Sequence, residues 1–284
     1  NDIRRSGGRI DLRAHPKASD DFGLPFIGRY IDLSSEDLEG FATNPVVYFR
    51  FSHPFDFETV SGPSVRIVDV TKESPTYNAP ASIHWKTTEG RLSNYICPHW
   101  LAVQRPIGSP LRPNTTYAAI VTTAVKPKAG PNFVSGKDFA AMLKDAAPTD
   151  PALAKAHTAY APLRDWIADT NQSPMAILNA AVFTTQDPEA MIRRLRAKVD
   201  ERATPSVSSL FDCSSGGASP CEDAMGRGAC AAASGAFTEI HGRIKLPIFQ
   251  QGTPPYLKPE DGGAIEVDAA DAPIVVSEMD VCFG

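Results

Sequence analysis

The residues that could do chemistry in this chain are a serine pentapeptide, a His-Gly pair and five cysteines. Serine hydrolases of the α/β type hold their nucleophile in a G-x-S-x-G turn between a strand and a helix. No pentapeptide of this form occurs; Gly217-Ala218-Ser219-Pro220-Cys221 comes nearest and differs at its last position. His241-Gly242 has the form of an oxyanion signal, but Arg243-Ile244-Lys245 follows it in an alternating strand pattern instead of a glycine-rich loop. The sequence therefore predicts no catalytic residue.

Other reactive side chains also lack a spacing that indicates a site. Cys97-Pro98-His99 holds the two residue types of a cysteine nucleophile and its base, but a proline-constrained turn with a buried or bridged cysteine is the simpler interpretation. The carboxylate pairs Asp20-Asp21 and Asp268/Asp271 fall in polar loops. The remaining histidines show no H-E-x-x-H or other metal-ligand spacing: His15, His53, His84 and His157. We expect no metal and no cofactor.

The cysteines indicate disulfides. Three of them fall in a Gly/Ser/Ala-rich stretch, with a C-x7-C-x8-C spacing that lacks the tight pairs of a zinc site. A glycine-rich segment cannot pack by itself, so disulfides that staple it are the better interpretation, with free thiols as the alternative. The disulfide candidates are Cys97, Cys213, Cys221, Cys230 and Cys282. The odd number leaves one unpaired within the chain, and oxidised cysteines favour a secreted or periplasmic location.

Composition narrows the class of protein. The chain has 284 residues, is 42% hydrophobic and carries a formal charge of −5, which does not indicate a nucleic-acid partner. No apolar run reaches the roughly 18 residues of a membrane span. The polar start without Met indicates a processed or trimmed N-terminus. Twenty-five prolines and 20 glycines, dispersed along the chain, favour short strands separated by turns.

Alternating apolar residues predict the elements that would position any site. Strands are expected at 47–51, 64–70, 82–85, 100–103 and 117–123, which together indicate an antiparallel β-sandwich. The motif Leu111-Arg112-Pro113-Asn114-Thr115-Thr116-Tyr117 leads into the last of these strands. In immunoglobulin-like sandwiches a tyrosine at such a corner turns its hydroxyl back onto the upstream backbone. We therefore expect Tyr117 to make that contact.

Helical spacing then interrupts the strands. The apolar residues Phe139, Met142, Leu143 and Ala146 indicate one helix. Asp150 should cap a second helix, which Pro162 should kink or split. A strand is expected at 177–185, and a further helix should start at Asp187-Pro188. The basic residues of that helix are interpreted as a solvated face.

Two last strands are expected, at 238–249 and 272–283. Pro247 indicates an edge position for the first of them, because proline has no N–H to donate. The second strand is apolar and is expected to need a neighbour on each side.

Several stretches, taken in order, resemble the N-terminal half of secreted or lipoprotein esterases and lipases of myxobacteria and related bacteria. In that family a bacterial immunoglobulin-like domain precedes an α/β-hydrolase domain. The stretches that carry the resemblance are Asn1–Arg5 with Gly8–Leu12, Phe51–Val60, Pro110–Val121, Ala181–Pro188 and Ile248–Tyr256. The resemblance implies that the oxyanion loop, the nucleophile and the rest of the triad lie beyond Gly284, so no catalytic residue can be assigned here.

This resemblance implies a mainly β fold in four parts. These are an extended N-terminal arm at 1–21, an immunoglobulin-like sandwich at 22–187 with a helical insertion at about 136–172, a helix and cysteine loop at 188–235, and the first two strands of an incomplete α/β-hydrolase sheet at 236–284. The function implied is that of the N-terminal, non-catalytic part of a secreted carboxylic-ester hydrolase. Its partner would be a C-terminal catalytic fragment of the same precursor, which binds the ester or lipid substrate. The location implied is secreted, periplasmic or associated with the outer membrane, with a lipoprotein anchor as one form.

Two alternatives stay open. A stand-alone extracellular immunoglobulin-like binding module would need no catalytic partner. A non-hydrolytic ligand carrier is a weaker alternative, because no aromatic cage or apolar groove is evident in the sequence pattern.

Overall fold

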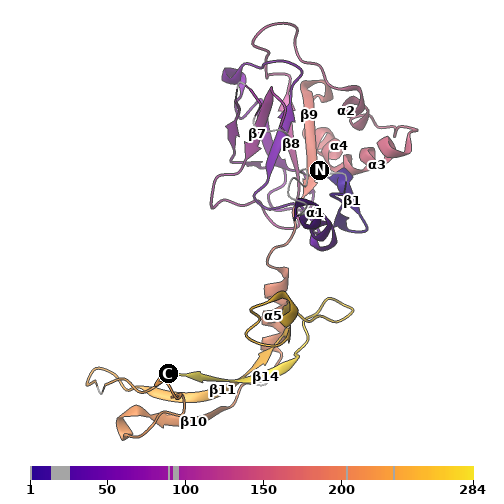
Figure 1. The fold of residues 1–284 in the computed structure, drawn as a ribbon. Helices are drawn as coiled ribbons and strands as arrows, with labels where there is room; N and C mark the ends of the chain where they lie inside the picture. Colours follow the sequence, from indigo (N-terminus) through magenta and orange to yellow (C-terminus); the bar gives the residue numbers. More distant parts are fainter. Residues whose placement is uncertain (1, 14–25, 89, 92–95, 203, 233) are drawn as a thin grey trace. The chain divides into compact units, whose positions relative to one another are not determined.

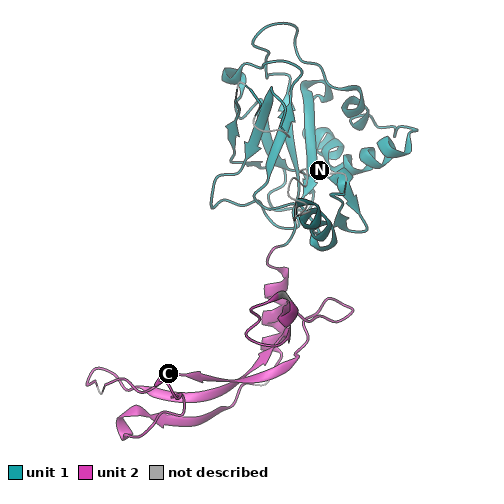
Figure 2. Ribbon diagram, in the orientation of Figure 1, with its two compact units in different colours: residues 1–187 teal, residues 188–284 magenta. Residues whose placement is uncertain are grey.

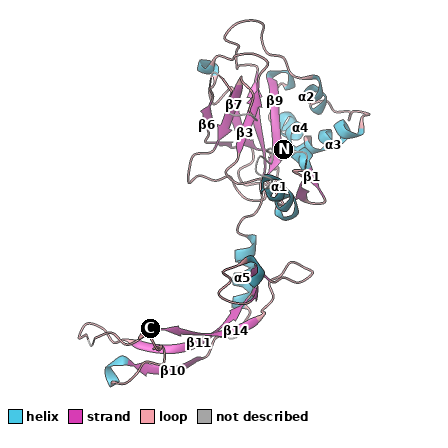
Figure 3. Ribbon diagram, in the orientation of Figure 1, coloured by secondary structure: helices cyan, strands magenta, loops and turns pink. Residues whose placement is uncertain are grey.

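The protein is described by a computed structural model that covers residues 2–13, 26–88, 90–91, 96–202, 204–232 and 234–284 (Figure 1). The chain divides into two compact units, Asn1–Asp187 (unit 1) and Pro188–Gly284 (unit 2), shown in Figure 2. The described residues form five antiparallel sheets (Figure 3). The mainly β fold predicted from the sequence is confirmed at this level. Among the described residues, no helix has the length and apolar character that a membrane crossing requires.

A four-stranded sheet forms the centre of unit 1. Its strands are β4 (Val65–Asp69), β5 (Pro80–Ala81), β8 (Thr116–Thr122) and β9 (Ile177–Thr184), in the order β5-β4-β8-β9. Residues of β8 alternate between two apolar environments, and five successive side chains of this strand are buried. A strand that is buried on both faces must be apolar throughout, which explains why its sequence is so continuously hydrophobic.

A second sheet covers one face of the first. It contains β3 (Val46–Arg50), β6 (His84–Lys86) and β7 (Trp100–Gln104), in the order β3-β7-β6. Phe49 and Leu101 from this sheet share a core with Ile67, Ala119 and other residues of the four-stranded sheet. Two antiparallel sheets therefore enclose one hydrophobic core.

Three helices cover the opposite face of the four-stranded sheet. They are α2 (Lys137–Met142), α3 (Pro151–Ala159) and α4 (Ala161–Asp169), and they lie between β8 and β9 in the chain. Leu163 and Trp166 of α4 pack with Ile120 in a second core. Two predictions from local sequence are confirmed. The Asp150 carboxylate accepts the Leu153 N–H at 2.9 Å, and the helix is interrupted at Tyr160, between α3 and α4, just before Pro162.

The corner before β8 also forms as predicted. The Tyr117 hydroxyl accepts the backbone N–H of Arg112 at 3.1 Å. The ring of Tyr117 is buried in the first core and stacks on Phe183. Burial raises the pKa of this phenol, which therefore stays protonated.

The N-terminal residues differ from their prediction. The sequence predicts an extended arm at 1–21, but residues 2–13 fold against the rest of unit 1 through a short helix η1 (Asp2–Arg4) and a hairpin of β1 (Arg5–Ser6) and β2 (Arg9–Ile10). The Asp2 carboxylate accepts the N–H and the hydroxyl of Thr184, at 3.0 and 2.6 Å. The arm prediction is wrong here because these anchoring partners are distant in the sequence. Residues 1 and 14–21 lie outside the described ranges.

The remaining elements of unit 1 are short. Helix α1 (Phe26–Asp37) was not predicted, and it leaves Ile27, Tyr30 and Leu33 exposed. Single turns occur at η2 (Phe57–Thr59) and η3 (Pro174–Ala176).

Unit 2 is built on a three-stranded sheet. Strand β11 (Ile240–Ile248) lies between β10 (Val207–Asp212) and β14 (Ser277–Phe283). The other elements are α5 (Ala190–Asp200), η4 (Cys213–Ser215), a hairpin of β12 (Gln250–Gly252) and β13 (Gly262–Ile265), and η5 (Pro259–Asp261).

Several predictions for unit 2 need correction. Strand β10 falls in the segment predicted as a helix and cysteine loop, and the last strand begins at Ser277 instead of Ala272. The edge position predicted for the strand at Pro247 is wrong for β11 as a whole. Arg243 and Ile244 have partners on both sides, but Pro247 pairs only with Glu278. The proline thus occupies the part of β11 that has one neighbour, where its missing N–H costs no ladder bond.

Helix α5 begins at Ala190, three residues after the predicted Asp187 start. Its basic side chains form ion pairs with carboxylates, among them Arg193 with Glu189 and Arg194 with Asp271, at 3.1 and 2.6 Å. These pairs agree with the interpretation of a solvated charged face.

Candidate functional site

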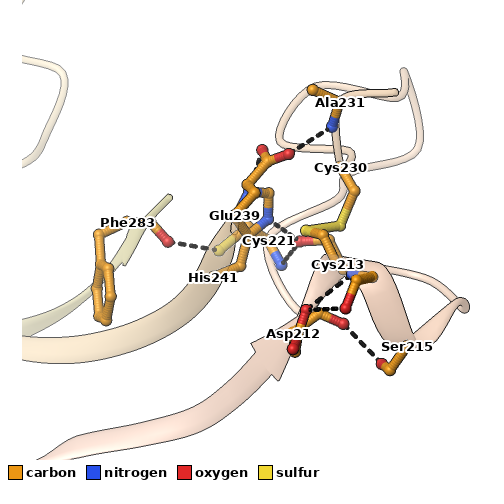
Figure 4. The surroundings of a disulfide bond; sticks show 11 residues. Asp212, Cys213, Ser215, Cys221, Cys230, Ala231, Glu239, His241 and Phe283 are labelled. Carbon is orange, nitrogen blue, oxygen red and sulfur yellow. Dashed lines mark hydrogen bonds and ion pairs between the residues drawn. A yellow bond between two sulfur atoms is a disulfide. The ribbon is translucent and has the colours of Figure 1, made fainter. Parts of the chain in front are cut away.

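Three polar residues of unit 2 meet in a cluster whose serine and histidine are buried, drawn in part in Figure 4. His241 is the second residue of β11, Glu239 comes just before this strand, and Ser219 lies in the loop between η4 and β11. Ser219 and His241 are only 6% and 4% exposed. We refer to Ser219, Glu239 and His241 as the serine–histidine cluster.

In the cluster the serine hydroxyl donates to the histidine, and the histidine donates to the glutamate. Nε2 of His241 lies 2.8 Å from the Glu239 carboxylate, which can only accept when it is ionised, so Nε2 carries the proton. In the tautomer with a single proton on Nε2, Nδ1 is the acceptor and receives the Ser219 hydroxyl, at 2.6 Å. This is the order of hydroxyl, imidazole and carboxylate that activates a serine nucleophile, although here the serine is on Nδ1.

Backbone groups hold both ends of the cluster. Glu239 also accepts the backbone N–H of Ala231 at 2.8 Å. This bond, followed in importance by the bond to His241, lowers the pKa of Glu239 below its usual range. At the other end, the Ser219 hydroxyl oxygen accepts the N–H of Cys221 at 3.0 Å. The serine oxygen therefore donates one hydrogen bond and accepts another.

Two disulfides flank the cluster. Cys213 bonds to Cys230, and Cys221 bonds to Cys282. Cys221 is two residues from Ser219, and Cys282 lies opposite Arg243 in the register of β11 and β14. Four of the five disulfide candidates are thus paired, and Cys97 is the cysteine left over.

The loop that carries Ser219 packs on one face of the sheet. His241, Arg243 and Lys245 alternate onto the same face of β11, and Cys282 on β14 shares it. The loop contacts this face at successive points: Ser219 bonds to His241, the Pro220 carbonyl accepts the Arg243 guanidinium at 2.8 and 3.1 Å, and Cys221 is bridged to Cys282. The cluster is the innermost of these polar contacts.

The burial of the cluster decides what it can do. A serine nucleophile needs the carbonyl carbon of its substrate about 3–3.5 Å from the hydroxyl oxygen. Residues as enclosed as Ser219 and His241 leave no approach for such a group. The backbone of Gly284 also packs closely on the imidazole of His241, since a Cβ added to Gly284 would lie 2.5 Å from that ring. In this conformation the cluster joins a loop to a strand, and it does not present a nucleophile.

A metal ion does not fit the residues as they stand. Ligand atoms of Cys213, Cys230 and His241 lie within 4.8 Å of one another. Thiolates bind metals, however, and both sulfurs here are consumed in their disulfide. The Glu239 carboxylate also already engages His241 Nε2.

The sequence motifs at two members of the cluster indicate no catalytic role. Ser219 stands in a pentapeptide that departs from G-x-S-x-G, and His241-Gly242 lacks the glycine-rich loop of an oxyanion signal. No motif marks Glu239. A weak signal was present, because Glu239 and His241 are two residues apart and so point to the same side of an extended segment. Nothing local connects them with Ser219.

The other residues considered from the sequence lie elsewhere. Nε2 of His157 bonds to the Lys144 carbonyl at 2.8 Å, and His53 stacks on Phe133. No hydrogen bond joins Cys97 to His99 among the described residues. Asp268 accepts the N–H groups of Ala270 and Ala272 in a turn. His15 and the pair Asp20-Asp21 lie outside the described ranges.

Comparison with known proteins adds no assignment. No protein-family model matches the chain, and no curated protein matches it either.

Proposed function

We propose that this chain is the N-terminal, non-catalytic part of a secreted carboxylic-ester hydrolase, and that a catalytic polypeptide of the same precursor packs on the β10-β11-β14 sheet of unit 2. In this proposal unit 1 is the immunoglobulin-like domain, with its corner at Tyr117, and β11 and β14 belong to the hydrolase sheet. The reactive serine belongs to the catalytic polypeptide.

The observation that carries the proposal is the uncovered apolar face of the unit 2 sheet. Register places one set of side chains on the face opposite the cysteine loop, and these side chains retain 36–49% of their exposure. They are Val207, Ile240, Leu246, Met279 and Phe283. An antiparallel sheet normally buries its apolar face against another layer. A contiguous exposed apolar surface of this kind is typical of an interface.

The opposite face of the same sheet is polar, so a catalytic polypeptide is expected to cover only the apolar face. That face carries Arg243, Lys245, Glu278 and Asp280 together with the disulfide at Cys282. It is occupied near His241 by the polar cysteine loop. The two faces thus differ in chemistry, and only the apolar one has energy to gain from a further layer.

Two further observations support the proposal. The disulfides agree with an oxidising location, and secretion to the periplasm or outer membrane, with or without a lipid anchor, belongs to the proposal. The burial of Ser219 is compatible with the non-catalytic role that the proposal gives to this chain.

The first experiment is mass spectrometry of the purified protein combined with fluorophosphonate labelling. We expect a companion fragment of roughly 200–350 residues, in the size range of common domains. The label should be found on a serine of that fragment and not on this chain. A preparation that contains this chain alone and takes up no label would overturn the proposal, and a label on Ser219 would overturn the non-catalytic role.

A second experiment tests the docking face with matched variants. Leu246 and Met279 face each other across β11 and β14 on the apolar side, while Lys245 and Asp280 do so on the polar side. L246S/M279S should weaken co-purification of the catalytic fragment, because it removes apolar area from the interface. K245S/D280S should leave co-purification unchanged. Equal behaviour of the two pairs would show that this face is not the interface.

Unit 1 favours a second candidate, a stand-alone binding module. It has two hydrophobic cores of its own, and a cleft of about 620 Å³ opens beside its three-stranded sheet. A module of this kind would be monodisperse without a companion and would remain unlabelled by fluorophosphonate. The labelling experiment therefore separates the two candidates.

A further inference from the structure

Two cysteines and a histidine of unit 2 bring three metal-ligating atoms together. The sulfurs of Cys213 and Cys230 and a ring nitrogen of His241 lie within 4.8 Å of one another, and Figure 4 shows the three side chains side by side. Ligand atoms on one tetrahedral zinc ion are about 3.3–3.8 Å apart, given bonds of about 2.0–2.3 Å from zinc to nitrogen and sulfur. A small adjustment of these side chains would therefore place all three atoms on one ion.

The disulfide decides whether these atoms can bind a metal. In the oxidised chain Cys213 and Cys230 have no thiolate to offer, whereas reduction yields two. With a phosphine as reductant, the S–S bond breaks, phosphorus takes the oxygen of one water as a phosphine oxide, and the two protons of that water go to the sulfurs. A Zn²⁺ ion that binds both sulfurs then releases these two protons to solvent.

Backbone contacts hold the ligand-bearing segments together independently of the disulfide. The Cys213 N–H donates to the Glu239 carbonyl at 3.0 Å, next to the point where β10 pairs with β11. The Glu239 carboxylate accepts the N–H of Ala231, the residue that follows Cys230, at 2.8 Å. None of these contacts uses a sulfur atom. We therefore expect both cysteines to stay near His241 when the S–S bond is cut.

The histidine is oriented in the way that metal-binding histidines are. Such a histidine binds the ion through one ring nitrogen, while a hydrogen bond on the other nitrogen fixes the ring. His241 has the Glu239 carboxylate 2.8 Å from Nε2 and the Ser219 hydroxyl 2.6 Å from Nδ1. Whichever nitrogen takes the ion, the other keeps a partner. The ring is also buried, so it has little side-chain freedom left to lose on binding.

We propose that unit 2 contains a redox-dependent zinc site, in which Cys213, Cys230 and His241 bind Zn²⁺ when the disulfide between the two cysteines is reduced. Two thiolates and an imidazole form a donor set that suits zinc, whereas Mg²⁺ and Ca²⁺ prefer oxygen ligands. The sequence pattern shows no zinc motif, because 17 positions separate the two cysteines and only the fold brings them to His241.

The disulfide and the zinc-bound form exclude each other, because both use the same two sulfurs. Either one links the end of β10 to the cysteine loop. In a secreted protein the zinc-bound form would belong to the chain before its export, since thiols stay reduced in the cytoplasm. This timing rests on the proposed secretion. The site itself uses only residues of unit 2, so its failure would leave the hydrolase proposal untouched.

The test uses Co²⁺ as a spectroscopic substitute for Zn²⁺ and the full chain, with and without reduction by a phosphine. We expect the reduced chain to bind Co²⁺ with a thiolate-to-cobalt charge-transfer band and the visible bands of tetrahedral cobalt. Added Zn²⁺ should remove these bands, because tetrahedral thiolate sites favour zinc. The oxidised chain should show none of them. A reduced chain without the bands would overturn the proposal, and so would equal bands in the oxidised chain.

Matched cysteine pairs identify the ligands. Reduced C221S/C282S should bind Co²⁺ as the parent does, whereas reduced C213S/C230S should lose the bands. Each variant lacks the two cysteines of one disulfide, and in the reduced state neither differs from the parent by a lost covalent link. Any other ranking of the two variants would overturn the assignment of the site to Cys213 and Cys230.

Histidine variants test the third ligand. H241Q should weaken Co²⁺ binding by the reduced chain more than about tenfold, since loss of a group that only supports a ligand already costs about 10–100-fold. H84Q, at an exposed position of unit 1, should leave binding unchanged. S219A breaks the loop contact of the same ring but keeps the ligand, so its cobalt bands should keep their positions. Unshifted bands in H241Q would show that His241 is not a ligand.

Discussion

The hydroxyl of Ser219 lies 2.6 Å from Nδ1 of His241, although 22 residues separate the two in the sequence. Both are buried, and the hydrogen bond joins the cysteine loop to the central strand of unit 2. The contact has the chemistry of an activated serine in a place that substrate cannot reach. Its energetic role is to satisfy two polar groups that would otherwise be buried without partners.

We therefore expect S219A to act on stability and not on catalysis. Loss of the hydroxyl leaves Nδ1 of His241 and the Cys221 N–H without their partner, which should cost about 1–3 kcal/mol. Amide hydrogen exchange of β11 measures this loss. S208A, at an exposed position of β10, should change stability by less than about 0.5 kcal/mol. Unchanged exchange of β11 in S219A would contradict the structural role.

The lowered pKa of Glu239 predicts that unit 2 loses stability in acid. A carboxylate whose folded pKa lies below its unfolded pKa of about 4.3 stabilises the folded state at pH values above the unfolded pKa. The contribution disappears as the pH falls through the folded pKa. Asp212, Asp223 and Asp268 have pKa values lowered in the same direction, by hydrogen bonds from Ser214, Arg227 and Ala272 respectively.

The E239Q variant isolates the part due to this residue. It should be less stable than the parent at neutral pH, and its β11 exchange should change less between pH 6 and pH 3, around the normal carboxyl range. E222Q, at an exposed position in the cysteine loop, is the control and should follow the parent. An E239Q profile parallel to that of the parent would show that Glu239 does not carry the effect.

The two disulfides should stabilise unit 2 by different amounts. Cys213–Cys230 spans 17 residues and Cys221–Cys282 spans 61. Chain-entropy arguments assign about 3 kcal/mol to the shorter loop and about 4 kcal/mol to the longer one. C221S/C282S should therefore unfold at lower urea than C213S/C230S. Tryptophan fluorescence should change little in either variant, because all three tryptophans are in unit 1; a large change there would contradict independent units.

The corner at Tyr117 predicts a loss of about 1 kcal/mol in Y117F. The substitution keeps the buried ring and its stacking on Phe183 but removes the acceptor of the Arg112 N–H. Urea unfolding followed by tryptophan fluorescence measures the change in unit 1. Y48F keeps the contact of its ring with Trp100 at an exposed site and should stay within about 0.5 kcal/mol of the parent. Equal stability of Y117F and Y48F would show that the corner bond contributes nothing.

Elements with local signals were predictable. Asp150 caps α3 and Pro162 divides it from α4, because both residues act on the backbone within one turn of themselves. Strand β3 follows from alternation with a period of two, and β8 follows from an unbroken run of apolar residues. Helix α1 and strand β10 were missed, since α1 leaves most of its apolar side chains exposed and β10 contains three serines or aspartates in six residues.

The sequence by itself determined strands β3, β4, β6, β7, β8 and β9 of unit 1, the tyrosine corner, the helices between β8 and β9, and a set of cysteines suited to disulfides. Each depends on spacing within a few residues. Only the tertiary structure decided which cysteines pair, that Asp2 anchors on Thr184, and that Ser219, Glu239 and His241 meet. These contacts depend on strand register and on the folding back of a long loop, and the free energy that selects them comes from burial summed over the whole unit, which no local pattern of residues records.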